Sequence, residues 1–220
     1  MPLIRVVGIP FARLWWRWRF EDLHKIPAAG PALIACNHLS YFDPVSNSHA
    51  ILRAGRIPRF LAKDELFRVP VLGWFLNAHS QIPVRRGTGD QSSLHHAKEA
   101  LARGEVVVIY PEGTVTKRPD HLPMQGKTGI VRLALETRMP VIPMASWGSA
   151  PIWQKSGRGS LKPGRPIWCR VGDAIDVAAR AGAASDYGTA KALTAEVMDV
   201  LTAMVVDLRS RYPERWSGDG

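Results

Sequence analysis

Short apolar runs and longer segments with apolar residues at helical spacing alternate along most of the chain. A short apolar run between turn residues predicts a buried strand, whereas apolar positions that recur every third or fourth residue predict an amphipathic helix. We therefore expect strands at residues 31–36, 57–62, 80–84, 106–110, 141–145 and 163–171, and helices at 43–54, 63–77, 91–103, 127–138 and 190–209. This order predicts an α/β fold, a single domain whose mixed sheet is flanked by helices.

The first twenty residues differ from this pattern, because aromatic and cationic side chains share one short segment. Apolar residues at helical spacing and arginines one turn apart predict an N-terminal amphipathic helix that lies in a membrane interface. The expected membrane contacts are Phe11, Trp15, Trp18, Arg13 and Arg17. The alternative is that the aromatic stripe packs on the domain. The expected division is residues 1–22 as a membrane-interface segment and 23–220 as the folded domain.

Composition and charge narrow the class of protein. The 220 residues carry 29 Lys and Arg against 19 Asp and Glu, a net charge of +10, which predicts attraction to polyanions. No apolar stretch reaches the roughly 18 residues of a membrane-spanning helix. The two cysteines, Cys36 and Cys169, lack disulfide or zinc-ligand spacing, which suits a reducing compartment. A non-enzymatic basic module for membranes or nucleic acid remains a minor alternative, but no nucleic-acid-binding motif is recognisable and no nucleic acid partner is expected.

A histidine and a carboxylate five residues apart, His38 and Asp43, directly follow the first predicted strand. An imidazole can take a proton from an alcohol near neutral pH, and a carboxylate on its far nitrogen fixes the tautomer and stabilises the imidazolium. The pair is therefore a candidate catalytic dyad. The structural alternative is that Asp43 caps a helix whose first residue is Pro44.

Two further loops follow predicted strands and carry polar residues of interest. Arg85 and Arg86 follow the 80–84 strand, and a guanidinium matches phosphate oxygens in bidentate geometry. Tyr-Pro-Glu-Gly-Thr follows the strongest strand and continues to Lys117, while Lys127 lies at the start of a predicted helix. Loops at the carboxyl ends of strands in an open α/β sheet commonly form one site. The expected substrate-binding residues are Arg85, Arg86, Glu112, Gly113, Thr114, Lys117 and Lys127.

Taken together, these segments resemble the 1-acylglycerol-3-phosphate acyltransferase family of glycerolipid acyltransferases. The resemblance spans residues 27–145 and rests on ordered motifs: NHLSYFDP, the KDELF segment with its following proline and glycine, IPVRR, YPEGT, the Lys-Thr-Gly helix start and the MPVIP turn.

The resemblance implies a role for each matched residue. His38 would be the general base on the acceptor hydroxyl and Asp43 its orienting carboxylate. Arg86 would bind the acceptor phosphate, and Glu112, Gly113 and Thr114 would shape the acceptor pocket. The implied reaction moves a fatty acyl group from an acyl thioester to a hydroxyl of a glycerol-phosphate lipid precursor, converting lysophosphatidic acid to phosphatidic acid. The implied co-substrate is acyl-CoA or an acyl-carrier protein, with no metal or redox cofactor.

Two positions depart from the family pattern. Arg85 stands where an aspartate is common, and Val115 stands where an arginine usually follows the Glu-Gly-Thr triplet. Lys117, Arg118 or Arg85 could replace that arginine. These departures bear on the acceptor, so a lysophospholipid acyltransferase or transacylase for a different headgroup is the main alternative. A thiol hydrolase using Cys36 is a weaker one.

A lipid acceptor and product would place the enzyme on a membrane. We expect a peripheral protein on the cytoplasmic face, held at an anionic membrane surface. The sequence leaves open the donor type, the chain-length and position preference, the headgroup, the oxyanion donors and the oligomeric state.

Overall fold

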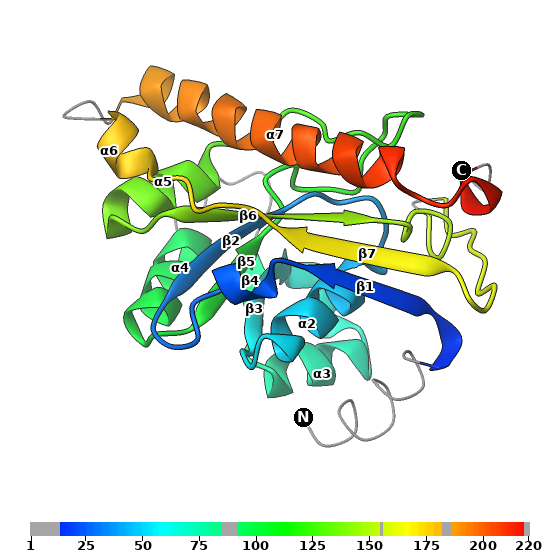
Figure 1. The fold of residues 1–220 in the computed structure, drawn as a ribbon. Coiled ribbons are helices and arrows are strands. Elements are labelled where there is room, and N and C mark those ends of the chain that lie inside the picture. Colours follow the sequence, from blue (N-terminus) through cyan, green and yellow to red (C-terminus); the bar gives the residue numbers. More distant parts are fainter. Residues whose placement is uncertain (1–13, 85–91, 155, 182–185, 218–220) are drawn as a thin grey trace.

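A computed structural model describes residues 14–84, 92–154, 156–181 and 186–217. Within these residues the chain forms a seven-stranded sheet of order β1-β7-β6-β2-β5-β3-β4, shown in Figure 1. Its strands are β1 (Arg17–Glu21), β2 (Ala32–Cys36), β3 (Pro58–Lys63), β4 (Ile82–Val84), β5 (Val106–Ile109), β6 (Val141–Trp147) and β7 (Pro166–Val171). All neighbouring pairs are parallel except β6 and β7, so the predicted α/β fold with a mixed sheet is confirmed.

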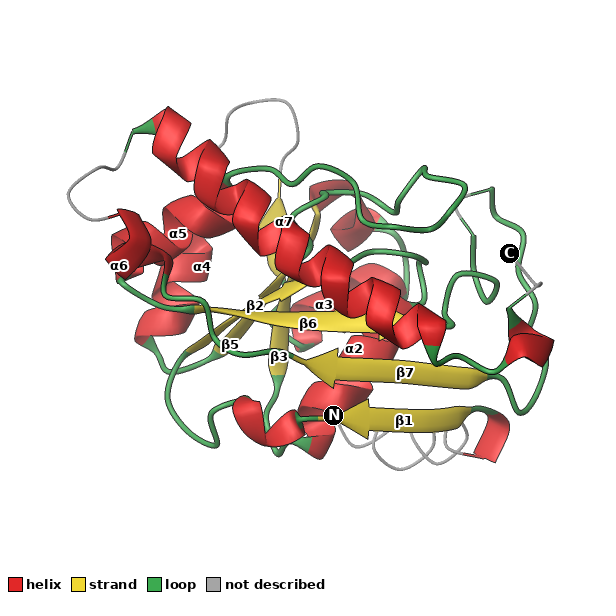
Figure 2. Cartoon of the chain, turned by 45° about the horizontal axis from the view of Figure 1, so that its top comes forward, coloured by secondary structure: helices red, strands yellow, loops and turns green. Residues whose placement is uncertain are grey.

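Helices cover both faces of the sheet, as Figures 1 and 2 show. The helices are α2 (Asp43–Arg53), α3 (Leu72–Ala78), α4 (Ser92–Ala102), α5 (Gly129–Thr137), α6 (Val177–Ala181) and α7 (Tyr187–Ser210). Within the described residues there are also three 3₁₀ turns, which are η2 (Leu23–Lys25), η3 (Asp64–Arg68) and η4 (Glu214–Trp216). Helix α7 begins at a capping residue, because the Asp186 carboxylate accepts the amide of Thr189 at 2.8 Å.

The central strand β2 is apolar on both sides because it is covered on both faces. Leu33 and Ala35 pack into the cluster formed with α4, α5 and α7, whereas Ile34 and Cys36 pack into the cluster formed with α2. Successive side chains of a strand point to opposite faces, so an unbroken apolar run is the pattern of a strand buried on both sides. This packing fixes where β2 ends and thus where the following loop begins.

The predicted N-terminal helix is wrong for residues 17–20, which belong to strand β1. This strand pairs in parallel with β7, with Arg17 opposite Pro166. Its residues alternate: Trp18 and Phe20 turn to α2, where their rings lie 4.6 and 5.0 Å from that of His49. Side chains that alternate between exposed and covered are typical of an edge strand with one covered face. Burial of the two aromatic rings stabilises this strand more than the helical spacing of the same residues would stabilise a helix.

Helix 63–77 was also predicted as a single element, and the structure divides it. Lys63 ends β3, η3 follows, and α3 starts only at Leu72. Pro70 explains the break, because the residue before a proline is driven out of the helical region and Val69 is extended. The other predicted helices and strands are present, with ends that differ by up to three residues from the expectation.

Candidate active site

The loops after β2 and β5 lie side by side because their strands are neighbours. β2 and β5 are parallel, with Ala35 opposite Ile109, so both chains leave the sheet at the same edge. The backbone of the two loops is joined by the amide of Thr116, which donates to the carbonyl of His38 at 2.7 Å. This pairing brings the predicted catalytic motif and the Tyr-Pro-Glu-Gly-Thr motif into one site, as expected for a sheet of this type.

The His38 and Asp43 side chains form the predicted pair. Nδ1 of His38 lies 2.9 Å from Oδ2 of Asp43. The carboxylate is completely buried, while 13% of the histidine side chain is exposed. A carboxylate on Nδ1 leaves Nε2 as the ring nitrogen that can meet a substrate, which is the geometry of a histidine general base.

Asp43 is held by donors on both oxygens and does not cap its helix. Oδ2 also accepts the amides of Leu39 at 2.5 Å and Ser40 at 2.8 Å, and Oδ1 accepts the hydroxyl of Ser149 at 2.5 Å. Asp43 is the first residue of α2, and no side-chain cap bond forms at the preceding residue. The capping alternative is therefore wrong, because the carboxylate turns back to the loop.

Glu112 connects the loop after β2 to the loop after β5. Its two carboxylate oxygens accept the amides of His38 at 2.8 Å and Met124 at 3.0 Å. Burial raises the pKa of Glu112 to about 7, and the two amide hydrogen bonds only partly oppose this rise. In this geometry Glu112 fixes loop backbone, whereas the sequence pointed to a substrate contact.

A buried polar network supports the histidine ring. Tyr110 stacks on His38 with ring centroids 4.2 Å apart, and the Tyr110 hydroxyl accepts from Nδ2 of Asn47 at 3.1 Å. Oδ1 of Asn47 in turn accepts the hydroxyl of Ser146 at 2.6 Å. Burial of the hydroxyl raises the pKa of Tyr110 well above its usual range, so the phenol stays neutral. The network therefore positions the ring without adding charge.

Gly113 and Lys127 meet beside this network. Gly113 has φ of +67°, a conformation that favours glycine, and a Cβ there would lie 3.1 Å from Nζ of Lys127. The amide of Lys127 donates to the carbonyl of Pro111 at 2.9 Å, which holds this lysine at the loop. The ammonium group thus lies alongside the predicted acceptor loop, as an anion site requires.

The structure describes only some of the remaining residues that were predicted to bind the substrate or the membrane. Arg85 and Arg86, and the membrane residues Phe11 and Arg13, lie outside the described residues. Lys117 is exposed, Thr114 is half-buried, and Arg118 is engaged with Asp120 at 2.6 Å. Arg118 is therefore the weaker candidate to replace the family's arginine.

The predicted membrane residues that are described pack partly against the domain. Trp15 and Trp18 join a cluster around Trp16, Ile152 and Ile167, and Nε1 of Trp15 donates to the carbonyl of Leu161 at 2.6 Å. Arg17 is exposed at the start of β1. The packing alternative thus accounts for most of the surface of these two tryptophans.

Besides the network of Asn47, Tyr110 and Ser146, the sequence analysis missed Ser149 and Lys63 as residues with a place in the site. Ser149 contacts Asp43 across 106 positions, and no local motif marks such a distant partner. Lys63 ends β3 opposite Val84, at the same edge of the sheet. Its position at the carboxyl end of a parallel strand was the available signal.

Cys36 does not fit the role of a nucleophile. Its side chain is fully buried, and burial raises the pKa of the thiol well above its usual range. Reactive cysteines need an accessible thiolate. The structure therefore removes the thiol hydrolase alternative.

Two features are absent from the described ranges. No helix there is long and apolar enough to cross a membrane. No group of three or more histidine, cysteine or acidic side chains in these ranges is arranged to hold a metal ion.

Comparisons with known proteins agree with this geometry. The family model described as Acyltransferase matches residues 17–147. A 1-acyl-sn-glycerol-3-phosphate acyltransferase of Bacillus subtilis is 32% identical over 148 residues, covering 65% of this chain and 70% of that protein. The chloroplastic 1-acyl-sn-glycerol-3-phosphate acyltransferase BAT2 of Brassica napus is 26% identical, and the match covers 70% of this chain but only 46% of the plant protein.

A solved structure has the same fold. The crystal structure of the 1-acyl-sn-glycerophosphate (LPA) acyltransferase PlsC from Thermotoga maritima matches with a TM-score of 0.72 and 25% identity, covering 94% of this chain and 78% of that one. The match of the family model over more than half of the chain, together with these relatives, shows that the chain belongs to the acyltransferase family of the 1-acylglycerol-3-phosphate acyltransferases.

Proposed function

We propose that this protein transfers a fatty acyl group from an acyl thioester to the free hydroxyl of lysophosphatidic acid, forming phosphatidic acid. The observation that carries the proposal is the His38 ring, fixed by a buried carboxylate on one nitrogen and partly exposed at the edge of the sheet. The names of the relatives from Bacillus subtilis and Thermotoga maritima support this acceptor.

The dyad supplies the proton transfer. Nδ1–H of His38 donates to Asp43, and Nε2 takes the proton of the acceptor hydroxyl as its oxygen attacks the thioester carbonyl carbon. The carbon–sulfur bond of the tetrahedral intermediate then breaks. The leaving thiolate takes the proton from the imidazolium, so the products are the ester and a neutral thiol. No covalent acyl-enzyme is needed.

The oxyanion of that intermediate requires hydrogen-bond donors. The amides next to His38 are occupied, because Glu112 takes that of His38 and Asp43 takes those of Leu39 and Ser40. By contrast, the amides of Thr114 and Val115 have no hydrogen-bond acceptor within the described ranges. We assign the oxyanion to this pair of amides.

The acceptor phosphate would be bound by cations at the same edge. Lys127 lies against Gly113, and Lys63 ends β3 just across from the strand that leads to Arg85 and Arg86. An ammonium group acts on a phosphate as a point charge, while a guanidinium can bind two oxygens together. We propose Lys127, Arg86 and Arg85 as the phosphate ligands, with Lys117 at the rim.

A different headgroup is the second candidate, and one observation favours it. Val115 stands where the family usually has an arginine, and only 3% of it is exposed, so this position offers no cation to the acceptor. A lysophospholipid acyltransferase or transacylase for another headgroup would need fewer cations there.

We also propose that the protein works at a membrane surface on the cytoplasmic side. Apolar side chains at three positions are strongly exposed: Leu14 at 88%, Val71 at 80% and Trp74 at 72%. Exposed apolar side chains on a protein with a net charge of +10 suit contact with anionic lipids. Flotation with anionic vesicles tests this, and a Val71→Ser/Trp74→Ser variant that floats as well as the wild type would exclude these two residues from the membrane contact.

An acyl-transfer assay with parallel acceptors tests the proposed function. Palmitoyl-CoA is offered with glycerol 3-phosphate, 1-acyl- and 2-acyl-glycerol 3-phosphate, and lysophosphatidylcholine. Transfer to 1-acylglycerol 3-phosphate that is lost in His38→Ala but kept in His24→Ala, an exposed histidine, is expected. Transfer restricted to the choline lipid would favour the second candidate.

A further inference from the structure

The His38 ring is the outermost of three stacked rings that come from three neighbouring chains of the sheet. The ring centroids of His38 and Tyr110 are 4.2 Å apart, and the two planes lie 22° from parallel. The centroids of Tyr110 and Phe60 are 6.0 Å apart, and these planes lie 14° from parallel. The dyad histidine therefore has an aromatic face against its own ring, and a second ring lies behind that face.

The register of the sheet places these rings together. Phe60 of β3 is opposite Val108 of β5, and Ala35 of β2 is opposite Ile109. Tyr110 follows β5 two residues after Val108, so its side chain lies on the same face of the sheet as that of Phe60. Neighbouring strands lie ~4.8 Å apart, close enough for side chains on one face to pack across them. The stack is thus a product of three parallel strands.

Two contacts hold the Tyr110 ring. Phe60, which lies behind it, is only 7% exposed and belongs to the apolar cluster around β2 and α2. At the other end of the ring, the hydroxyl accepts from Nδ2 of Asn47, a residue of α2, at 3.1 Å. Because burial raises the pKa of Tyr110, the phenol carries no charge. His38 therefore faces a fixed and neutral π system.

The stacked face matters at the moment when the His38 ring becomes charged. Nδ1 of the ring meets Asp43, and in the proposed mechanism Nε2 takes the proton of the acceptor hydroxyl. An aromatic face attracts a cation that lies within about 6 Å of its centroid, and a neutral imidazole lacks this attraction. An interaction that strengthens only as the charge develops raises kcat without tightening the binding of substrate.

We propose that Tyr110 is a positioning residue of the acyl-transfer reaction, because its ring face orients His38 and stabilises the imidazolium that forms there. The effect on catalysis rests on the proposed function, whereas the effect on the protonation of the ring does not. For a largely buried cation on an aromatic face we expect about a tenfold change in the protonation equilibrium, or about one pH unit.

The other titratable groups around the ring are the same in every variant described below. Asp43 of α2 meets Nδ1, and Glu112 in the loop after β5 accepts the amide of His38. The amide of Lys127 donates to that same loop, and Cys36, whose thiol has a pKa raised by burial, ends β2. A difference between the variants therefore reports the loss of the ring face and no change in these groups.

NMR titration of the His38 ring between about pH 5 and 8 measures its protonation directly, with the signal assigned by its absence in His38→Ala. In Tyr110→Leu the midpoint should fall by about one pH unit, because an imidazolium without the aromatic face loses its proton more readily. Tyr110→Phe keeps the face and should stay within about 0.3 pH unit of the wild type. Tyr110→Met, which also lacks a ring, repeats the test with an unbranched side chain if the leucine variant does not fold.

Steady-state acyl transfer gives the second readout. In Tyr110→Leu we expect kcat to fall about five- to tenfold with an unchanged KM for the acceptor. The acid limb of its pH profile should move to lower pH together with the NMR midpoint. Tyr110→Phe should keep kcat within about twofold of the wild type.

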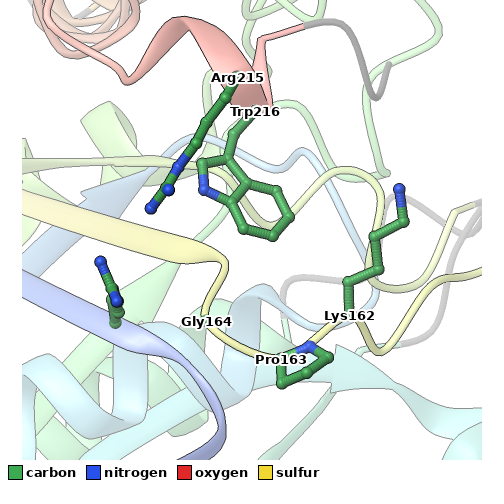
Figure 3. A pocket seen from close by; sticks show the side chains of 6 residues that line it. Lys162, Pro163, Gly164, Arg215 and Trp216 are labelled. Atoms are coloured by element: carbon green, nitrogen blue, oxygen red, sulfur yellow. The ribbon is translucent and has the colours of Figure 1, made fainter.

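Trp216→Leu is the matched control, because the Trp216 ring also has a cation on its face. The guanidinium carbon of Arg165 lies 4.8 Å from its centroid. Figure 3 shows Trp216 beside Arg215 on the C-terminal turn, and Trp216 lines a pocket of about 400 Å³ together with Arg17, the first residue of β1. Strand β1 lies three strands from β2, so this control should leave the His38 midpoint unchanged and kcat within about twofold.

Two results would overturn the inference. One is a fall of kcat in Tyr110→Leu with an unchanged midpoint, which would make the role of Tyr110 purely structural. The other is an equal loss in Tyr110→Phe and Tyr110→Leu, which would assign the effect to the hydroxyl and not to the ring face. A midpoint that shifts as expected in a protein without acyl transfer would support the effect on protonation and refute the proposed function instead.

Discussion

Replacing Asp43 by asparagine removes one charge from the dyad while keeping its shape. The asparagine oxygen can take the position of Oδ2 and accept from His38, Leu39 and Ser40. Its amide group can then donate to the hydroxyl of Ser149, which accepts as well as donates. The hydrogen bonds therefore persist, and we expect a folded protein.

The catalytic cost follows from the lost charge. In the proposed mechanism, the carboxylate stabilises the imidazolium that forms when Nε2 takes the proton, with charge centres about 4 Å apart. At an effective dielectric constant of about 20, this attraction amounts to about 4 kcal/mol. That energy corresponds to roughly a thousandfold in kcat. The KM for the acceptor should change little, because the buried carboxylate cannot touch the acceptor.

Steady-state thiol release from palmitoyl-CoA with 1-acylglycerol 3-phosphate measures both constants, and thermal unfolding checks the fold. Asp173→Asn is the matched control, since Asp173 is an exposed carboxylate paired with Lys25. A folded Asp43→Asn protein whose kcat lies within tenfold of the wild type would refute the role of the charge.

Three other substitutions give separate tests. Ser149→Ala removes one donor to Asp43, so we expect kcat to fall about tenfold with the KM unchanged, and an unchanged kcat would show that Ser149 has no positioning role. Burial raises the pKa of Glu112 to about 7 from an ordinary 4.5, so the unfolded chain loses this proton at a lower pH than the folded protein does. The contribution of Glu112 to the free energy of unfolding is therefore complete below pH 4.5 and falls by about 3 kcal/mol as the pH rises to 7. In urea unfolding between pH 5 and 8, Glu112→Gln should lack this decline, and equal slopes in both proteins would contradict the assignment. Gly113→Ala puts a Cβ on a residue with φ of +67° and crowds the side chain of Lys127, so we expect the free energy of unfolding to fall by about 1 kcal/mol. We also expect a several-fold higher KM for phosphate-bearing acceptors. An unchanged KM would show that Lys127 does not bind the acceptor.

The buried strands were predictable because their environment is uniform. The apolar runs of β2, β5 and β6 lie between two helical layers, and such runs have few alternatives in an α/β chain. Strand β1 was not predicted because its alternating Arg-Trp-Arg-Phe sequence also satisfies a helical spacing over a short window. Its partner, β7, lies about 150 positions away, and local pattern carries no information on such pairing.

The site was predictable where its residues are local. His38 and Asp43 are five residues apart, and the single turn of chain between them, just before α2, brings their side chains into contact. Glu112 was identified, but its contacts with two backbone amides depend on how two loops meet, which the sequence does not contain. Ser149 was missed for the same reason, because its contact with Asp43 exists only once β6 lies beside β2.

The most direct test of the chemistry is thiol release from palmitoyl-CoA with and without 1-acylglycerol 3-phosphate. If His38 draws the proton from an acceptor hydroxyl that attacks the thioester directly, thiol release requires the acceptor and yields one diacyl product per thiol. It should also be lost in a folded His38→Ala variant. Thiol release at the same rate without acceptor, or its persistence in that variant, would contradict a His38-dependent direct transfer.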